Sequence, residues 1–387
     1  MADRRVILVD GVTGYWGGRV AARLTAQPEL HVIGLDADPP EEEIKGLDFI
    51  QADIRNPLLA ELLKEEAVDT VCHLAFDESH RPSESSFDLN VMGTMKVFSA
   101  CVEANVRKIV FMSSTLVYGA EPMNSAFLRE EHALNGQRGN GTVRDLVEVE
   151  GFINGFRGQA PSSMMVTVLR FAHIVGPNCD TPMTRFLREE TAPVLMGFDP
   201  MMQVIHEDDV VGAIVQAVDQ DVPGTFNVAA EHSLPLFKLM GLGGKFPIPI
   251  LHPLAYLGAS VLGSSIAPID LNYLRYPCVG DLCRMREELG FTPQYTSEET
   301  LREFAAQQRL RKYMPESAAL ALDEERLRDT IERRRRAREA QAGASARPRR
   351  KSRARRAAVN PVENDSPLDM FETLKAPISD DEENGHG

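Results

Sequence analysis

Cysteine is scarce in this chain of 387 residues: there are five, an odd number, and they are scattered along the sequence. A disulfide-stapled secreted domain and a zinc site both need paired or clustered cysteines, so we expect neither, nor any other metal site. The N-terminus offers only four apolar residues, 6–9, after its first charges, which is too short for a signal peptide. We therefore expect a cytoplasmic protein with reduced cysteines.

Long uncharged stretches are also rare. One such stretch, 246–269, is long enough to span a membrane, but four of its residues are proline and one is histidine. Because proline interrupts a helix, we do not expect a transmembrane segment. Two interpretations remain, a helix in a substrate-binding region and contact with a membrane surface, and the helix is favoured.

Basic residues are outnumbered by acidic ones, and the net charge is −15. The distribution is uneven, because residues 326–356 contain 14 basic and three acidic residues, a net charge of +11, which leaves −26 for the rest. The acidic globular part is not expected to bind nucleic acid. The basic segment can bind RNA, DNA or an anionic membrane, or pair with the acidic body. No aromatic residue lies among its arginines, so base stacking is not expected.

The clearest motif lies near the N-terminus and combines a strand, a glycine turn and a helix. Residues 6–9 form an apolar run typical of a buried parallel strand, and residues 18–24 have helical periodicity. Between them stand Gly11, Gly14 and Gly17. Such glycines let the backbone approach a pyrophosphate closely, and the helix N-terminus supplies free N–H groups. The arrangement predicts a dinucleotide-binding site.

A second apolar strand, 31–35, ends in Asp36, 19 residues after Gly17. A carboxylate at this distance bonds the adenosine ribose hydroxyls and repels a 2′-phosphate, which favours NAD over NADP. Strands and helices then alternate, which predicts an α/β fold with a doubly wound parallel sheet covered on both faces. The further strands are expected at 49–53, 70–76 and 108–112, and helices at 58–66 and 86–104.

Together these motifs make the chain resemble an extended (atypical) short-chain dehydrogenase/reductase of the NAD-dependent epimerase/dehydratase family, over residues 6–310. Their order and spacing both match that family, whose members bind NAD and act on sugar nucleotides. The residues that carry the resemblance are Gly11, Gly14, Gly17, Asp36, Asp53, His73-Leu74-Ala75, Asn90, Ser113-Ser114, Val117-Tyr118-Gly119, Leu169-Arg170, Gly176-Pro177, His206 and Asp209.

The resemblance implies which residues form each site. Those that would hold NAD are Gly11, Gly14, Gly17, Asp36, Asp53, Leu74, Ala75 and Asn90. Three residues, Tyr118, His173 and His206, would line the substrate pocket. Asp10 replaces the threonine or serine usual before the first glycine, and would add a carboxylate near the phosphates.

The resemblance also implies a Rossmann part and a smaller C-terminal substrate-side part that interleave, and a homodimer formed by a helix pair. A charged helix and a disordered tail, basic and then acidic, would follow. The boundaries are 1–175 with 204–230 for the NAD-binding part, 176–203 with 231–312 for the substrate-side part, 313–342 for the charged helix and 343–387 for the tail.

In this family a Tyr-x-x-x-Lys pair, on the helix after the fifth strand, moves the proton that accompanies hydride transfer. The corresponding positions here are Thr142 and Leu146, and none of the seven tyrosines is followed by lysine four residues later. A threonine hydroxyl is too weak an acid to replace the phenol, and leucine has no charge. Ser114, at the end of the preceding strand, corresponds to the residue that holds the reacting hydroxyl.

Two functional hypotheses follow. The protein is either an NAD-dependent enzyme with a non-standard site for a sugar-nucleotide-like substrate, or a catalytically silent NAD-binding sensor or scaffold. In the second case its basic tail would contact a partner, nucleic acid or an anionic membrane. The cofactor motifs fit both hypotheses, and the lost Tyr-Lys pair favours the second. Candidates for a replacement acid or base are Tyr118, His132, Glu148 and His173, of which His173 is more simply explained as a pocket wall.

Overall fold

The computed structural model describes residues 4–77, 83–136, 141–158, 161, 164–189, 191–251, 269–313 and 328. The charged helix predicted at 313–342 and the tail predicted at 343–387 lie outside these residues, apart from Tyr313 and Arg328. Within the described part, no helix is long and apolar enough to cross a membrane.

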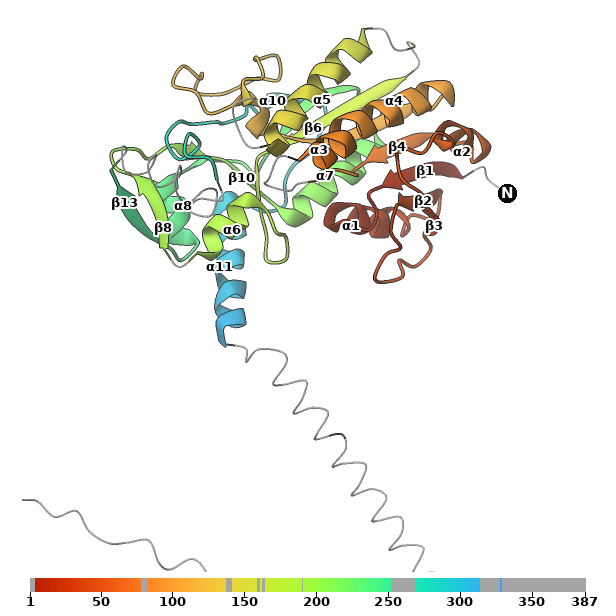
Figure 1. Cartoon of the computed structure of the whole chain (residues 1–387). Coiled ribbons are helices and arrows are strands. Elements are labelled where there is room, and N and C mark those ends of the chain that lie inside the picture. The colour runs from red at the N-terminus through yellow and green to blue at the C-terminus, as the bar shows by residue number, and fades with distance from the viewer. Residues whose placement is uncertain are drawn as a thin grey trace, which may run out of the picture. The chain divides into compact units, whose positions relative to one another are not determined.

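Seven parallel strands form the central sheet in the order β11-β6-β5-β4-β1-β2-β3 (Figure 1). Most are short apolar runs that are buried on both faces, as expected for strands covered by helices on each side. The predicted α/β class is confirmed. The strands are β1 (Arg5–Asp10), β2 (Leu30–Asp36), β3 (Asp48–Gln51), β4 (Thr70–His73), β5 (Lys108–Ser114), β6 (Met165–Phe171) and β11 (Gly224–Val228).

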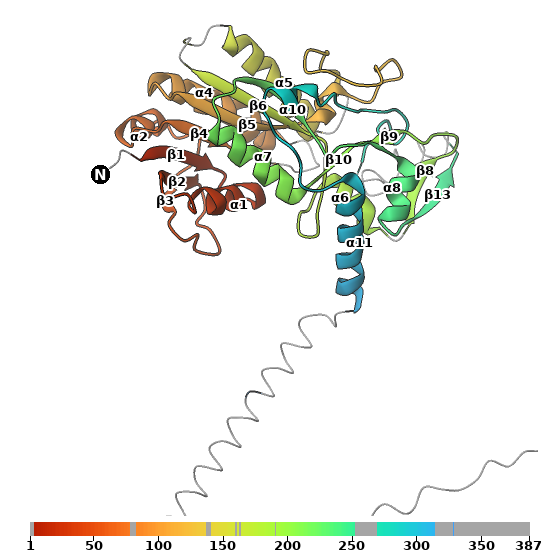
Figure 2. The ribbon, with the colours of Figure 1, turned by 180° about the vertical axis from the view of Figure 1, so that it is seen from behind.

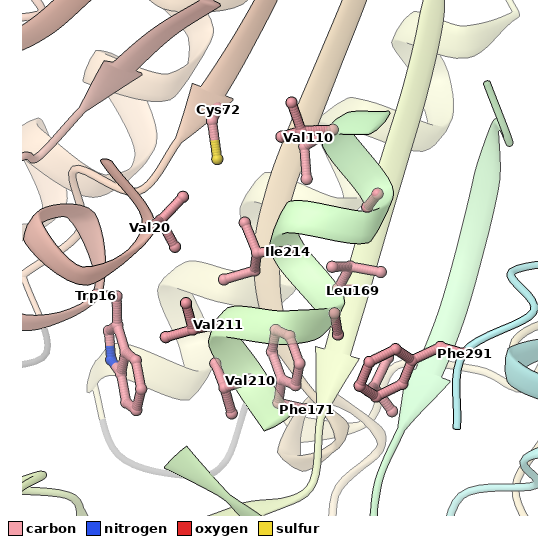
Figure 3. Close-up of a cluster of buried hydrophobic side chains, with 14 of the residues drawn as sticks. Trp16, Val20, Cys72, Val110, Leu169, Phe171, Val210, Val211, Ile214 and Phe291 are labelled. Carbon is pink, nitrogen blue, oxygen red and sulfur yellow. The ribbon is translucent and has the colours of Figure 1, made fainter. Parts of the chain in front are cut away.

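Helices cover both faces of this sheet, and each face has its own apolar cluster. On one face α1 and α7 lie side by side (Figure 2), and Val20 and Ile214 pack with Val110 of the sheet (Figure 3). On the other face α2, α4 and α5 bury Leu63, Phe98 and Ile153. The bounds are α1 (Tyr15–Leu24), α7 (Glu207–Asp219), α2 (Leu59–Glu65), α4 (Thr94–Glu103) and α5 (Gly141–Arg157).

The helix predicted at 86–104 is interrupted in the structure. It consists of α3 (Glu84–Phe87), a π-helical segment η1 (Asp88–Gly93) and α4. Asn90 lies in the π segment, where its side chain accepts from the backbone N–H of Asp77 (2.7 Å) and donates to the Asp77 carbonyl (3.0 Å). The widened turn thus coincides with a side chain that fixes the loop after β4, as is frequent for π segments near functional sites.

A smaller part is built around a third apolar cluster. The chain leaves the central sheet after β6, forms this part, returns with α7 and β11, and then leaves again; the domain boundaries given above stay a prediction. Its strands are β7 (His173–Val175), β8 (Thr191–Leu195), β9 (Met201–Met202), β10 (Val204–His206), β12 (Leu234–Pro235) and β13 (Phe246–Ile250). The other helices among the described residues are η2 (Thr115–Tyr118), α6 (Pro182–Arg188), α8 (Leu236–Leu242), α10 (Cys283–Glu287) and α11 (Ser297–Tyr313).

The prediction of a helix within 246–269 is wrong for the first five residues. They form strand β13, which pairs in parallel with β8. Pro247 and Pro249 cause this difference, because proline lacks an N–H and keeps the preceding residue extended. Residues 252–268 lie outside the described part of the chain.

Candidate functional site

The glycine turn after β1 has the close backbone contacts that a phosphate-binding turn needs. Gly11 has a φ of +65°, and a Cβ there would lie 2.6 Å from the Ala75 nitrogen. A Cβ at Gly17 would lie 2.1 Å from the Gly11 carbonyl oxygen. Gly14 precedes the first residue of α1, and no acidic residue lies in the first turn of that helix. The turn therefore requires glycine, and the first turn of α1 contributes no negative charge of its own.

Asp10 does not point its carboxylate at this turn, contrary to our expectation of a charge near the phosphates. It is buried and accepts from the backbone N–H groups of Leu74 (2.7 Å) and Ala75 (2.8 Å). Its second oxygen lies 2.7 Å from Nδ1 of His73, whose Nε2 lies 2.9 Å from the Thr94 hydroxyl. The carboxylate is thus occupied in fixing the end of β4 beside the turn.

Asp36 lies at the end of β2, beside the glycine turn. One carboxylate oxygen accepts from the Thr13 hydroxyl (2.6 Å) and the Thr13 N–H (3.0 Å), and the other accepts from the N–H of Ala37 (2.8 Å). A carboxylate has about four lone-pair directions, so Asp36 retains acceptor capacity for ribose hydroxyls.

Asp53 and Asn90 are engaged in protein contacts. Asp53 bonds the Arg55 guanidinium (2.6 Å), which lowers the pKa of this carboxyl. Asn90 is fully buried, and besides its bonds to Asp77 it donates to the carboxylate of Asp145 (3.1 Å). Neither residue lines the cavity described next.

A cavity of about 400 Å³ joins the glycine turn to the carboxyl ends of β5 and β6. Asp180 is the one residue with a formal charge among the described residues that line it. The lining includes Gly14, Tyr15, Trp16, Gly17, His73, Leu74, Phe76, Met112, Ser114, Leu116, Thr142, Leu146, Phe171, His173, Ile174, Asn178, Asp180 and Thr181. The structure therefore brings residues predicted for cofactor, catalysis and substrate into one space.

Ser114 occupies the cavity wall at the junction of β5 and η2. Its hydroxyl accepts from the N–H of Leu116 (3.2 Å) and donates to the Phe171 carbonyl (3.3 Å). Both bonds are long, so the hydroxyl can exchange the second for a ligand at little cost.

Thr142 and Leu146 lie one turn apart near the start of α5, and both line the cavity. Leu146 is 7% exposed and packs in the apolar cluster under the helix. This end of the cavity therefore has a neutral hydroxyl and an aliphatic side chain at the two positions that correspond to the tyrosine and the lysine of the acid–base pair.

His173 lines the cavity at the start of β7, edge-on to the Tyr273 ring with 6.3 Å between ring centres. Burial lowers the pKa of His173 to about 4, so the imidazole is neutral near pH 7. It can exchange hydrogen bonds with a ligand but is a weak base.

Tyr118 and His206 do not lie in the cavity lining, although we expected both in the substrate pocket. The Tyr118 hydroxyl is buried; it donates to Asn227 (2.7 Å) and accepts from Arg170 (2.7 Å). His206 is buried at the start of α7, where its Nδ1 accepts from the Asp208 N–H (3.1 Å) and its ring stacks on Tyr295. Both side chains stabilise the fold around the site.

The other two candidates for a replacement acid or base also lie elsewhere. Glu148 is on the exposed side of α5. His132 is in the loop that follows η2, where its Nδ1 accepts from the N–H of Arg129 (2.9 Å). Neither side chain lines the cavity.

Tyr15 and Glu207 were missed from the sequence. Tyr15 lies inside the glycine motif, lines the cavity and donates to the buried Glu207 carboxylate (2.8 Å). A tyrosine next to a glycine turn was the available signal for the first residue. Glu207 belongs to a helix 192 residues further along the chain, and nothing in its local sequence indicates that it contacts the glycine turn.

The fold and this cavity define a dinucleotide-binding α/β protein. A family model described as the NAD dependent epimerase/dehydratase family matches residues 7–229, and the chain belongs to this family. This confirms the predicted family and its cofactor, NAD.

Several known proteins are similar to the chain. An uncharacterized protein of Mycobacterium tuberculosis is 33% identical over 314 residues, covering 78% of this chain and 83% of that protein. Short-chain dehydrogenase/reductase family 42E member 1 of Xenopus laevis is 24% identical over 279 residues, covering 63% of this chain and 69% of that protein.

Solved structures share the fold. UDP-glucose 4-epimerase from Thermotoga maritima, crystallised with UDP-glucose, has a TM-score of 0.61 and 21% identity, covering 79% of this chain and 98% of that one. The Bordetella bronchiseptica enzyme WbmH, in complex with NAD⁺, has a TM-score of 0.61 and 18% identity, covering 79% and 99%.

Proposed function

We propose that this protein holds NAD along the glycine turn and binds a nucleotide-sugar-like ligand in the same cavity, with slow hydride transfer. The observation that carries the proposal is the single cavity that joins Gly14 and Gly17 to Ser114, Thr142 and Leu146. The family and the structural neighbours support the two ligand classes.

The residues present fit NAD. The turn has no space for a Cβ at Gly11 or Gly17, and the N-terminus of α1 would face the pyrophosphate. Asp36, with acceptor capacity left, would bind the adenosine ribose hydroxyls. Bound NAD supplies a hydride acceptor, and the rest of the reaction depends on the side chains of the protein.

Those side chains position a substrate better than they move a proton. Ser114 would accept or donate a hydrogen bond at the reacting hydroxyl of the substrate. Thr142 cannot ionise near neutral pH, Leu146 provides no cation to lower a neighbouring pKa, and the low pKa of His173 makes it a weak proton acceptor. We expect turnover about 10²- to 10⁴-fold below that of a site with a working acid–base pair.

A second candidate function is a catalytically silent NAD sensor or scaffold. The burial of Leu146 in the cluster beneath α5 favours it, because this packing fills the position of the missing cation. In this case the basic segment 326–356 would contact an anionic partner. We also propose that two copies of this chain form a homodimer.

Cofactor retention and turnover separate these functions. The protein is purified, the NAD that it retains is released and measured, and UDP-glucose and UDP-glucuronic acid are added while the reduced cofactor is followed by absorbance. We expect retained NAD and slow reduction that disappears in Ser114→Ala. Retained NAD with neither reduction nor conversion of any nucleotide sugar supports the silent sensor, whereas a protein that binds no NAD contradicts both candidates.

A further inference from the structure

Glu207 places a buried carboxylate where three segments of the chain meet. It lies in the first turn of α7 with 1% of its surface exposed. One carboxylate oxygen accepts from the Tyr15 hydroxyl (2.8 Å) and from the N–H of Cys179 (2.7 Å). Both oxygens also lie 3.3–3.4 Å from the N–H of Asn178. The carboxylate therefore joins the glycine turn to the loop after β7.

Neighbouring residues make space for this contact and orient it. A Cβ at Gly176 would lie 2.3 Å from the Glu207 carboxyl carbon, so only glycine admits the side chain. Arg19 donates to the Tyr15 oxygen (2.9 Å) and pairs with Asp208. Burial and the adjacent Glu207 raise the pKa of Tyr15, so its hydroxyl stays protonated and donates to the carboxylate.

The two segments joined by Glu207 both contribute residues to the lining of the cavity. Tyr15 belongs to the glycine turn, and Asn178 belongs to the loop that leads to α6. Tyr15 is 38% exposed, so part of this residue faces solvent. The contact between Tyr15 and Glu207 is therefore part of the wall that would surround a ligand on the turn.

We propose that Glu207 is a positioning residue that, through Tyr15, holds the glycine turn against residues 176–180 and thereby slows the release of NAD. This inference rests on the proposed function, because it needs NAD on the glycine turn. The Tyr15 hydroxyl is the link that can be removed with least disturbance, since Glu207 keeps its bonds to Cys179 and Asn178.

The test compares Tyr15→Phe with the wild type and with Tyr276→Phe. Tyr276 is outside the cavity lining, and its ring packs against Phe198 and Arg275 instead. NAD release is followed by dilution into excess unlabelled NAD after loading with isotope-labelled NAD. A hydrogen bond to a charged group typically changes an equilibrium constant tenfold or more. We therefore expect the rate of NAD release to be about tenfold faster in Tyr15→Phe and unchanged in the control.

A second measurement does not require NAD. Hydrogen–deuterium exchange of the ligand-free protein should show faster exchange at residues 11–17 in Tyr15→Phe, because this turn loses its link to Glu207 while Cys179 and Asn178 keep theirs. The melting temperature should be nearly unchanged. Equal release rates in wild type and Tyr15→Phe overturn the inference. If the wild type binds no NAD, the proposed function fails and the inference fails with it. The exchange data then show separately whether Glu207 links the glycine turn to the loop after β7.

Discussion

The two ends of the cavity differ in what holds them. At the glycine turn, close backbone contacts and buried hydrogen bonds determine the geometry. The carboxylates of Asp10, Asp36 and Glu207 all accept hydrogen bonds there. At the start of α5 the wall is formed by Thr142 and the aliphatic Leu146. Cofactor binding therefore depends on backbone shape and catalysis on a few side chains, so one can be lost while the other is kept.

The largest expected effect is a gain of turnover at the end of the cavity formed by α5. Thr142→Tyr combined with Leu146→Lys should raise turnover of a nucleotide sugar by about 10²- to 10⁴-fold, because a lysine one turn away lowers the pKa of the tyrosine. NAD affinity should change far less. Steady-state kinetics and NAD titration on one preparation measure both.

Each single substitution is the matched control for the double variant. Thr142→Tyr alone lacks the cation, and Leu146→Lys alone lacks the proton donor and places an unpaired charge in an apolar cluster. A double variant that binds NAD without faster turnover would show that the loss at this end extends beyond these two positions.

At the opposite end, Gly17→Val should reduce NAD affinity by about a hundredfold or more, since its Cβ would lie 2.1 Å from the Gly11 oxygen and the turn has to open. Isothermal titration with NAD measures the effect. Gly155→Ala is the control, because nothing lies within 4 Å of a Cβ at that position in α5. Unaltered NAD binding in Gly17→Val would contradict the assignment of this turn to the cofactor.

The sequence was sufficient for the fold and for the glycine turn because both depend on local patterns, a buried strand followed by small residues and a helix. It was insufficient for Tyr118 and His206. Their side chains contact residues far away in the sequence. Tyr118 hydrogen-bonds to Asn227 and Arg170, and His206 stacks on Tyr295. Which partner a buried polar group finds is decided by tertiary packing, and a motif does not encode that choice.

Asp10 illustrates the same limit and gives a smaller prediction. Asn at this position has one acceptor oxygen for the three donors that now surround it, so Asp10→Asn should lose about 1–3 kcal/mol of unfolding free energy. NAD affinity should fall a fewfold with it, because Leu74 lines the cavity. Urea unfolding measures the first effect and NAD titration the second. Asp38→Asn, an exposed site, should change stability by less than about 0.5 kcal/mol.

The last expected effect concerns the pH dependence of stability and involves His173, which lines the cavity. Burial lowers the pKa of His173 to about 4 in the folded protein, below the ordinary value of 6.5. Between these two values the unfolded chain binds a proton that the folded protein does not, so the contribution of His173 to stability is lost progressively as the pH falls from 6.5 towards 4. His173→Asn should therefore lose less stability than the wild type between pH 7 and pH 5, as measured by urea midpoints.

His232→Asn is the control for that comparison, because it removes an exposed imidazole at a positive φ, which asparagine tolerates. It should lose the same stability as the wild type between the two pH values. If His173→Asn also behaves like the wild type, the imidazole is solvated and charged in the folded protein at pH 5. The cavity would then hold a usable proton carrier, and the contrast between a well-built cofactor end and a weak catalytic end would no longer hold.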